Sequence, residues 1–428
     1  MLARVVRMSI AVAVLALPAC VVKLSHENAP LTNGDVTGQT ADCTSAQPLG
    51  LGGPGIGAGA VKFTGRFVTA PAGAVFDWSG NEISARFEGT EATVGLTTGA
   101  PILLMAVVDD RPPIKFEAIP KRTGYLVVSG LPSGVHTITI HRNSEPLYGP
   151  LSFTGFNFGP NSKLLPPIEH PRRIEIIGDS ITCGYGNEGQ NATCPFDVFD
   201  GSGPDAARIP LTENQYLAFG SLAGRTLSAD TVTLCYSGKG IYQNYREGAQ
   251  GEGTAINQDV VKTDPDGKTL MPRYYQRTLA SQPDSPLWDF GTEPEPQVVV
   301  IALGTNDFSR DVNNDSVADG IDVSRFRAAY SDFVGFIRSK RPNAHIFMSV
   351  SPMVTDKFPL DNARSDFRST LKGIAAEFDA KGDKKVYAME MVEQGSVYGL
   401  GCDYHPNLTV HEIMSQQLVG AIRSKLCW

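Results

Sequence analysis

A serine at the end of an apolar run is the first residue whose position suggests chemistry. The run "RIEIIG", residues 173–178, leads directly into Asp179 and Ser180. A serine hydroxyl attacks a carbonyl carbon effectively only when a base accepts its proton and when donors stabilise the resulting oxyanion. The segment "CDYHPN" near the C-terminus offers His405 as that base. The pair is a candidate for a serine nucleophile with its histidine base.

Two further segments offer oxyanion donors. "YSGKG" contains Gly238, whose missing side chain lets its backbone N–H face a ligand closely, and "LGTND" contains the side-chain amide of Asn306. Each residue also has an ordinary interpretation: Gly238 as a turn residue, Asn306 as a helix cap, and His405 as a structural histidine. Their order along the chain, with three of the four loops following predicted strands, favours one shared site.

Those strands are continuous apolar runs. They occupy residues 173–178, 231–237, 297–304, 344–351 and 385–391. Such runs, alternating with helical patterns, are typical of a parallel sheet that helices cover on both faces. The clearest helical faces consist of Phe326, Tyr330, Phe333, Val334 and Ile337 before Pro342, and of Val410, Met414, Leu418 and Ile422. Ligands of such sheets bind beyond the carboxyl ends of the strands, where Ser180 is expected.

The preceding part of the chain has a different texture. Residues 61–165 contain short alternating runs separated by Gly, Pro and Asp, which predict an antiparallel β-sandwich. Residues 21–60 include "GLGGPGIGAGA" and are predicted to be a flexible linker. The division predicts two domains, residues 61–165 and 170–428.

The N-terminus predicts export. Arg4 and Arg7 precede an apolar stretch that is too short to span a bilayer, so residues 1–20 are interpreted as a signal peptide. Its last residues, "LPAC", resemble a bacterial lipobox, which would make Cys20 the lipidated residue and attach the protein to the cell envelope. Cleavage near Ala19 to a secreted protein is the alternative.

Charge and cysteine content limit the partners. The net charge of −8, without a Lys/Arg cluster, argues against a nucleic-acid partner, and a carbohydrate fits better. Of seven cysteines, six remain for disulfides if Cys20 carries lipid. We expect the pairs Cys183–Cys194 and Cys402–Cys427, because each would tie a loop beside the proposed site.

The set of motifs resembles the GDSL, or SGNH, hydrolase superfamily. The strings "IEIIGDSITCGYGNEG", "SGKG", "ALGTNDFS" and "GCDYHPN", with "LSFTGF" in the preceding β-rich part, are similar to carbohydrate esterase family two. The resemblance implies a jelly-roll β-sandwich followed by a flavodoxin-like α/β/α domain, and deacetylation of polysaccharides such as xylan or glucomannan without a required cofactor. It implies Ser180 as the nucleophile and His405 as the base, with the Ser180 N–H, Gly238 N–H and Asn306 amide as oxyanion donors.

One position departs from the superfamily pattern. Many members carry an aspartate three residues before the histidine, where this chain has Cys402, and the nearest carboxylate is Asp403. An orienting group holds the imidazole in the correct tautomer. Two alternatives stay open: the Asp403 carboxylate orients His405, or a backbone carbonyl does so and leaves a Ser-His dyad.

Other residues predict binding functions. Asp311, Asn313, Asp315, Asp319 and Asp322 have the spacing of a calcium loop, but a solvated acidic loop is the interpretation we favour. Tyr185, Tyr242 and Tyr404 lie in or beside the motif loops and are candidate sugar-stacking rings, with core packing as the alternative. Lys239 is interpreted as solvated.

Three functions are compatible with these patterns. The first is an O-acetylesterase acting on polysaccharides. The second is an esterase of the same fold acting on lipid esters or acetylated cell-wall glycans. The third is a glycan-binding lipoprotein without catalytic activity.

Overall fold

The structure is a computed structural model, and its description excludes several segments. The described residues are 36–40, 61–70, 73–200, 207–245, 269–311, 315–395 and 397–428. Residues 33–428 form one compact unit, and the other unit, residues 1–32, lies outside the described part. The predicted signal peptide with Cys20, and most of the predicted linker, therefore also lie outside it.

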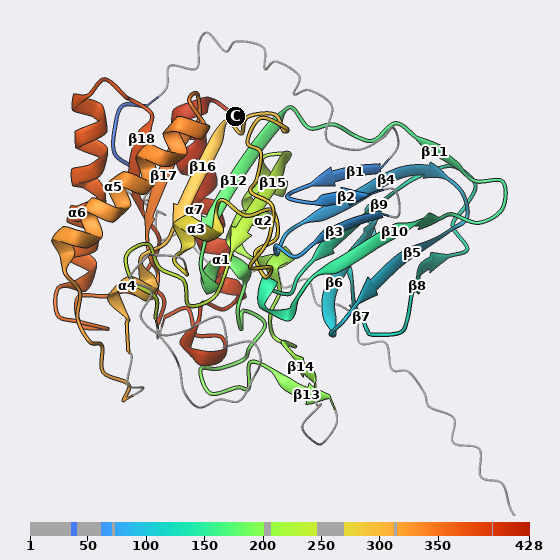
Figure 1. Cartoon of the computed structure of the whole chain (residues 1–428), viewed down its shortest axis with the longest axis horizontal. Helices are drawn as coiled ribbons and strands as arrows, with labels where there is room; N and C mark the ends of the chain where they lie inside the picture. The colour runs from blue at the N-terminus through green and yellow to red at the C-terminus, as the bar shows by residue number, and fades with distance from the viewer. Residues whose placement is uncertain are drawn as a thin grey trace, which may run out of the picture. The chain divides into compact units, whose positions relative to one another are not determined.

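Residues 61–165 form two antiparallel sheets. Their strands are β1 (Val61–Thr64), β2 (Val68–Ala70), β3 (Gly73–Phe76), β4 (Glu82–Glu88), β5 (Glu91–Thr98), β6 (Ile102–Val108), β7 (Ile114–Ala118), β8 (Gly124–Ser129), β9 (Val135–Arg142), β10 (Leu151–Asn157) and β11 (Lys163–Leu165). One sheet has the order β1-β4-β9-β6-β7 with β11 beside β4, and the other has the order β2-β3-β10-β5-β8. Alternate residues of the strands point inward into a common core, for example Phe87, Val94 and Ile138. The predicted antiparallel β-rich region is thus confirmed (Figure 1).

The second part is built on a parallel sheet. Its strands are β12 (Arg172–Gly178), β15 (Ala229–Cys235), β16 (Val298–Ala302), β17 (His345–Val350) and β18 (Val386–Glu390). Their spatial order is β15-β12-β16-β17-β18, and all neighbouring pairs are parallel. This is the flavodoxin-like order, in which the first strand lies between the second and the third. A small antiparallel hairpin, β13 (Val198–Asp200) with β14 (Ala207–Ile209), lies outside this sheet.

Helices cover both faces of the parallel sheet. The helices are α1 (Ser180–Cys183), α2 (Phe219–Thr226), α3 (Met271–Tyr274), α4 (Thr305–Phe308), α5 (Val323–Lys340), α6 (Ala363–Ala380) and α7 (Leu408–Leu426). Buried residues of α5 and α6 share a core with one face of the strands, and those of α2 and α7 share a core with the other (Figure 1). The two helical faces predicted from the sequence are buried in α5 and α7. Among the described helices, none combines the length and apolar character needed to cross a membrane.

Part of the predicted linker is not a free tether. Thr37 donates its backbone N–H to the carbonyl of Ala388 at 3.0 Å, and its hydroxyl accepts the Ala388 N–H at 2.8 Å. The Lys425 side chain also donates to the Gly38 carbonyl at 2.7 Å. Because β18 is the edge strand of the sheet, its unpaired backbone groups can bind this segment. The prediction of a flexible linker is therefore wrong for residues 36–40.

Candidate active site

Ser180 lies at the carboxyl end of the central strand β12. The chain turns from β12 into the short helix α1, and Asp179 caps that helix by accepting the Ile181 N–H at 3.1 Å. Ser180 is the first residue of the helix and is only 7% exposed. A serine in this position is presented at the edge of the sheet where the flanking strands also end.

The imidazole of His405 contacts this serine. His405 Nε2 lies 2.9 Å from Ser180 Oγ, and His405 Nδ1 lies 2.9 Å from the backbone carbonyl oxygen of Asp403. A carbonyl can only accept, so Nδ1 carries the hydrogen and the Nε2 lone pair faces the serine. Burial lowers the pKa of His405, which keeps the ring neutral near neutral pH. The arrangement can therefore accept a proton from Ser180.

The carboxylate of Asp403 has another partner. Its Oδ2 accepts a hydrogen bond from the Tyr185 hydroxyl at 2.8 Å, and the Asp403 side chain is exposed. Of the two orienting groups considered above, the geometry therefore has the backbone carbonyl on His405. Asp403 has a left-handed backbone with φ of 48°, and this conformation accompanies the turn of its carbonyl toward the ring.

The candidate oxyanion donors come from neighbouring strands. Gly238 follows β15 with φ of +75°, a conformation that favours glycine, and Asn306 lies in α4 after β16. The Asn306 amide donates to the carbonyl of Lys239 at 2.9 Å, so it joins these two loops directly. Ser180, Gly238 and Asn306 are thus brought to one edge of the sheet at adjacent strands.

Two buried acids, for which the sequence predicted no role, brace these loops. Asp307 accepts the backbone N–H groups of Ile241, Tyr242 and Gln243 at 3.1, 2.7 and 3.0 Å. Asp179 lies 3.4 Å from the Asn306 amide. Burial raises the pKa of Asp307 to about 6 and that of Asp179 to about 7. Their place in the "GDS" and "GTND" strings was a signal for a role at the site.

The disulfides differ from the predicted pairs. Cys183 is bonded to Cys235, and Cys194 is bonded to Cys402, while Cys427 is also oxidised in a disulfide. Both predicted pairs, Cys183–Cys194 and Cys402–Cys427, are therefore wrong. Cys183 ends the helix that begins with Ser180, and Cys235 is paired with Gly178 across the adjacent strand, so these two cysteines are close in space.

The three candidate sugar-stacking tyrosines have different environments. The Tyr185 ring is stacked on Phe196 at 3.4 Å and lies 4.3 Å from the His405 ring, so it supports the histidine. Tyr242 packs against the hydrophobic core. Tyr404 is 61% exposed and directly precedes His405, which leaves its ring accessible beside the site.

Lys239 is not solvated. It is 1% exposed, and its Nζ lies 4.7 Å from the ring centroid of Tyr274 and 5.0 Å from that of Tyr236. The long aliphatic stem and the faces of two aromatic rings allow this cation to be buried. The interpretation of Lys239 as a solvated residue is therefore wrong.

The calcium-loop residues do not converge within the described part of the chain. Asp311 accepts the N–H groups of Asp315 and Ser316, each at 3.1 Å, and Asp322 caps α5 through Ser324 and Arg325. Asn313 lies outside the described residues, and none of the described carboxylates Asp311, Asp315, Asp319 and Asp322 belongs to a metal-compatible group. The one such group found among described residues is Glu145, Cys183 and Glu213.

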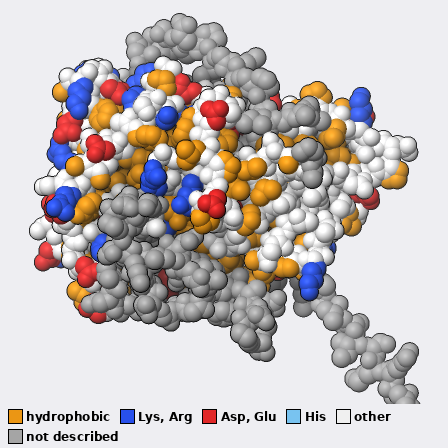
Figure 2. All heavy atoms as spheres, viewed as in Figure 1, with side chains coloured by type: hydrophobic (Ala, Val, Ile, Leu, Met, Phe, Trp, Pro, Cys, Tyr) orange, Lys and Arg blue, Asp and Glu red, His pale blue; other side chains and the backbone are white. Residues whose placement is uncertain are grey.

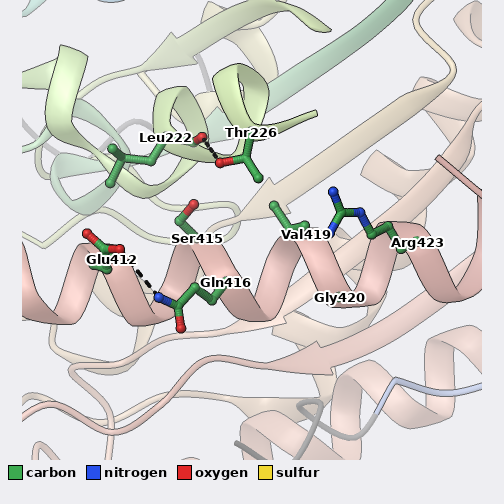
Figure 3. A pocket seen from close by; sticks show the side chains of 8 residues that line it. All are labelled: Leu222, Thr226, Glu412, Ser415, Gln416, Val419, Gly420 and Arg423. Atoms are coloured by element: carbon green, nitrogen blue, oxygen red, sulfur yellow. Dashed lines mark hydrogen bonds between the residues drawn. The ribbon is translucent and has the colours of Figure 1, made fainter. Parts of the chain in front are cut away.

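A groove between α2 and α7 is separate from these loops. Its volume is about 310 Å³, and its lining residues are Leu222, Thr226, Glu412, Ser415, Gln416, Val419, Gly420 and Arg423 (Figure 3). The lining includes none of the serine, histidine or donor residues described above.

On the face of the molecule in Figure 2, acidic and basic side chains of described residues are interspersed, which agrees with the absence of a cationic cluster in the sequence.

Two family models match the chain. Residues 63–167 match the model described as carbohydrate esterase 2 N-terminal, and residues 176–413 match the GDSL-like lipase/acylhydrolase family. The two matches coincide with the β-sandwich and with most of the parallel-sheet part. The site described above lies within the second match.

Individual proteins and solved structures agree with these matches. The chain is 34% identical to the cellulase/esterase CelE of Acetivibrio thermocellus over 86% of its length, but it spans only 40% of that protein. It is 26% identical to an acetylxylan esterase/glucomannan deacetylase of Cellvibrio japonicus, covering 90% of this chain and 93% of the relative. A family two carbohydrate esterase from Clostridium thermocellum, solved in complex with cellohexaose, is 32% identical with a TM-score of 0.71, covering 86% of this chain and 99% of that one.

Proposed function

The chain belongs to carbohydrate esterase family 2, and its residues 176–413 belong to the GDSL-like lipase/acylhydrolase family. On this basis we propose that it is a serine esterase that removes O-acetyl groups from polysaccharides. The contact between His405 Nε2 and Ser180 Oγ, at 2.9 Å, is the observation that carries this proposal. A nucleophile within hydrogen-bond reach of an oriented base is the minimum arrangement for acyl transfer.

The mechanism follows from the groups at the site. His405 accepts the Ser180 proton while Ser180 Oγ attacks the acetyl carbonyl carbon. The oxyanion receives hydrogen bonds from the Ser180 and Gly238 N–H groups. The third donor is the Asn306 N–H that faces Asp179 at 3.4 Å, the longer of the two contacts of this amide. His405 then protonates the sugar oxygen as the ester bond breaks, and a water activated by the same ring releases acetate from Ser180.

The proposed substrate is an acetylated plant polysaccharide such as xylan or glucomannan. Two curated relatives from Cellvibrio japonicus carry the name acetylxylan esterase/glucomannan deacetylase, and the Clostridium thermocellum relative was solved with cellohexaose. The exposed Tyr404 ring beside His405 supports a glycan substrate, because sugar rings stack on aromatic faces.

We further propose that the protein is exported and that Cys20 is its lipid attachment site. Loss of lipid labelling in a Cys20→Ala variant is the test.

Replacing the nucleophile tests the proposal. The Ser180→Ala variant should lower kcat for 4-nitrophenyl acetate by at least about 10³-fold, because the acetyl-serine intermediate cannot form. A Ser339→Ala variant, which changes an exposed serine in α5, should keep full activity. Near-normal turnover by the Ser180→Ala variant would overturn the assignment.

The acyl and glycan preferences separate the alternative functions. Acetate release from acetylated xylan and glucomannan, with turnover falling for longer acyl chains on aryl esters, supports the proposed substrate. Faster turnover of long-chain esters would instead identify a lipid esterase, and release from acetylated peptidoglycan alone would identify a cell-wall esterase. Polysaccharide binding without any acetate release would identify a glycan-binding protein.

A further inference from the structure

A buried glutamate of the β-sandwich reaches the loop that carries Gly238. Glu145 lies between β9 and β10, directly before a 3₁₀ helix at Pro146–Tyr148, and is 0% exposed. Its Oε2 accepts the backbone N–H of Ser237 at 2.7 Å, and its Oε1 accepts the Ser237 hydroxyl. Both oxygens of the Glu145 carboxylate therefore bind Ser237, although Glu145 and Ser237 lie 92 positions apart in the chain.

Ser237 is the residue directly before Gly238. The proposed oxyanion donor, the Gly238 N–H, belongs to the peptide group that joins these two residues. After Gly238, the Lys239 carbonyl is held by the Asn306 amide at 2.9 Å. The donor peptide thus lies between two anchored residues, one held from the β-sandwich and the other from α4. Oxyanion donors act through their fixed orientation, so an anchor of this kind affects the transition state more than substrate binding.

The neighbours of Glu145 argue for positioning and against a metal site. Ligand atoms of Glu145, Cys183 and Glu213 lie within 4.8 Å of one another. The Cys183 sulfur is bonded to Cys235 and offers no thiolate, so only two carboxyl groups remain. Both are buried, and burial raises the pKa of each, which disfavours the two ionised carboxylates that a cation would need.

The charged groups around this carboxyl pair have other partners as well. Arg142 donates to the backbone carbonyls of Ser144 and Glu145, each at 2.9 Å, and Lys115 binds Glu188. Arg142 and Lys115 still favour the ionised form of Glu213. Arg142 and Lys115 are thus bound to other groups, while both oxygens of the Glu145 carboxyl group bind Ser237 and Glu213 lies beside it.

We propose that Glu145 is a positioning residue of the esterase site, which holds Ser237 from the β-sandwich and thereby orients the backbone N–H of Gly238 toward the oxyanion. The inference rests on the proposed esterase function. It assigns the β-sandwich a part in catalysis in addition to its part in folding.

The test compares two buried interdomain contacts at opposite ends of the same strand. In the Glu145→Gln variant, the amide can accept only one of the two bonds from Ser237. In the matched Lys62→Met variant, the bond of Lys62 to Asp230 at 2.8 Å is lost at the start of β15, away from the site. Steady-state hydrolysis of 4-nitrophenyl acetate, inhibition by a boronic acid that forms a tetrahedral adduct with the serine, and thermal melting are measured for both variants and the wild type.

The Glu145→Gln variant should lower kcat by about 10- to 100-fold with KM changed less than about threefold, because one donor is misaligned in the transition state. Its inhibition constant for the boronic acid should rise in parallel with the loss of kcat. The Lys62→Met variant should keep kcat even where its melting temperature falls equally. A Ser237→Ala variant, which loses only the hydroxyl bond, should lower kcat by a smaller factor and provides the answer if the Glu145→Gln variant does not fold.

An unchanged kcat in the Glu145→Gln variant, or equal losses in the Glu145→Gln and Lys62→Met variants, would overturn the inference while leaving the esterase assignment intact. If Ser237→Ala is the usable variant, an unchanged kcat overturns it in the same way. A wild-type protein without esterase activity would overturn the proposed function itself, and this inference with it.

Discussion

At the scale of residues, the site differs from a carboxylate-oriented triad. The His405 ring is held by the Asp403 carbonyl at Nδ1 and by the Tyr185 ring against one side. A carbonyl fixes the same tautomer that a carboxylate would fix, but it would add less stabilisation to the imidazolium of the proposed reaction. The Asp403 carboxylate is linked to the His405 ring only indirectly, through its bond to the Tyr185 hydroxyl.

The Asp403→Asn variant should therefore retain kcat/KM within about threefold of the wild type, whereas the same change in a true triad costs about 10⁴-fold. Asparagine tolerates the left-handed backbone of this position and can still accept from Tyr185. Hydrolysis of 4-nitrophenyl acetate is the measurement, with His405→Ala as the inactive control. A loss above about 100-fold in a folded Asp403→Asn variant would show that the carboxylate is the orienting group.

Glu213 should make stability depend on pH. Burial, together with the nearby Glu145 carboxyl group, raises the pKa of Glu213 well above its ordinary value. A native pKa above the unfolded one means that its contribution is fully present at low pH and is lost as the pH rises through the native pKa. The free energy of unfolding of the Glu213→Gln variant should thus fall less between about pH 5 and about pH 9 than that of the wild type. Urea unfolding at both pH values measures these free energies, and the Glu412→Gln variant, at an exposed position, is the control. An equal fall in the free energy of unfolding in all three proteins would contradict the prediction.

At the scale of elements, the proposed functional groups lie on separate segments that follow different strands of the sheet, and disulfides join some of these segments to one another. Cys183–Cys235 joins the helix of Ser180 to the strand that leads to Gly238. Cys194–Cys402 joins the 3₁₀ helix before His405 to the loop that contains Phe196. Both bonds therefore limit relative motion of the segments that carry the proposed nucleophile, donors and base.

Removing the first of these bonds should destabilise the fold. The Cys183→Ala/Cys235→Ala double variant should lower the free energy of unfolding by about 2–4 kcal/mol, because the bond closes a loop of substantial length, with a sequence separation of 52. Urea unfolding under non-reducing conditions is the measurement, and wild-type protein in reductant serves as the comparison. A decrease of less than about 1 kcal/mol in the free energy of unfolding would contradict this prediction, because the disulfide would then add little stability beyond that of side-chain packing.

At the scale of the whole molecule, the β-sandwich and the parallel-sheet part share buried contacts. Trp78 follows β3, is 0% exposed, and belongs to the same buried cluster as Ile177 and Val232 of the parallel sheet. Its indole N–H donates to the Thr278 carbonyl at 3.1 Å. Asp77 accepts the backbone N–H groups of Ala280 and Ser281 at 2.9 and 2.7 Å. The parallel-sheet part therefore depends on groups supplied by the sandwich.

The Trp78→Ala variant should lower the free energy of unfolding of the whole chain by about 3–5 kcal/mol, because it opens a large cavity and removes a buried hydrogen bond. Calorimetry should still show one cooperative transition, at a lower temperature. The Leu126→Ala variant, at a side chain 60% exposed on β8, should change stability by less than about 0.5 kcal/mol. Two separate transitions in either variant would contradict the shared core.

Much of the architecture could be predicted because it rests on local patterns. Apolar runs of strand length with helical periodicity between them specify a parallel sheet, and the carboxyl ends of its strands then place Ser180, Gly238 and Asn306 together. The resemblance of the motif set to a known esterase family then pointed to a serine nucleophile and a histidine base. The sequence by itself therefore determined the fold class and the proposed participants of the reaction.

Other features depended on distances that spacing along the chain does not encode. The disulfide partners, the carbonyl on His405, the burial of Lys239 between two rings and the reach of Glu145 to Ser237 each join segments that only the packed fold brings together. These contacts have no periodic signature, since each depends on the orientation of one side chain across a boundary between elements. Only the tertiary structure decided them, because hydrogen bonds and disulfides require positions defined to within a few tenths of an ångström.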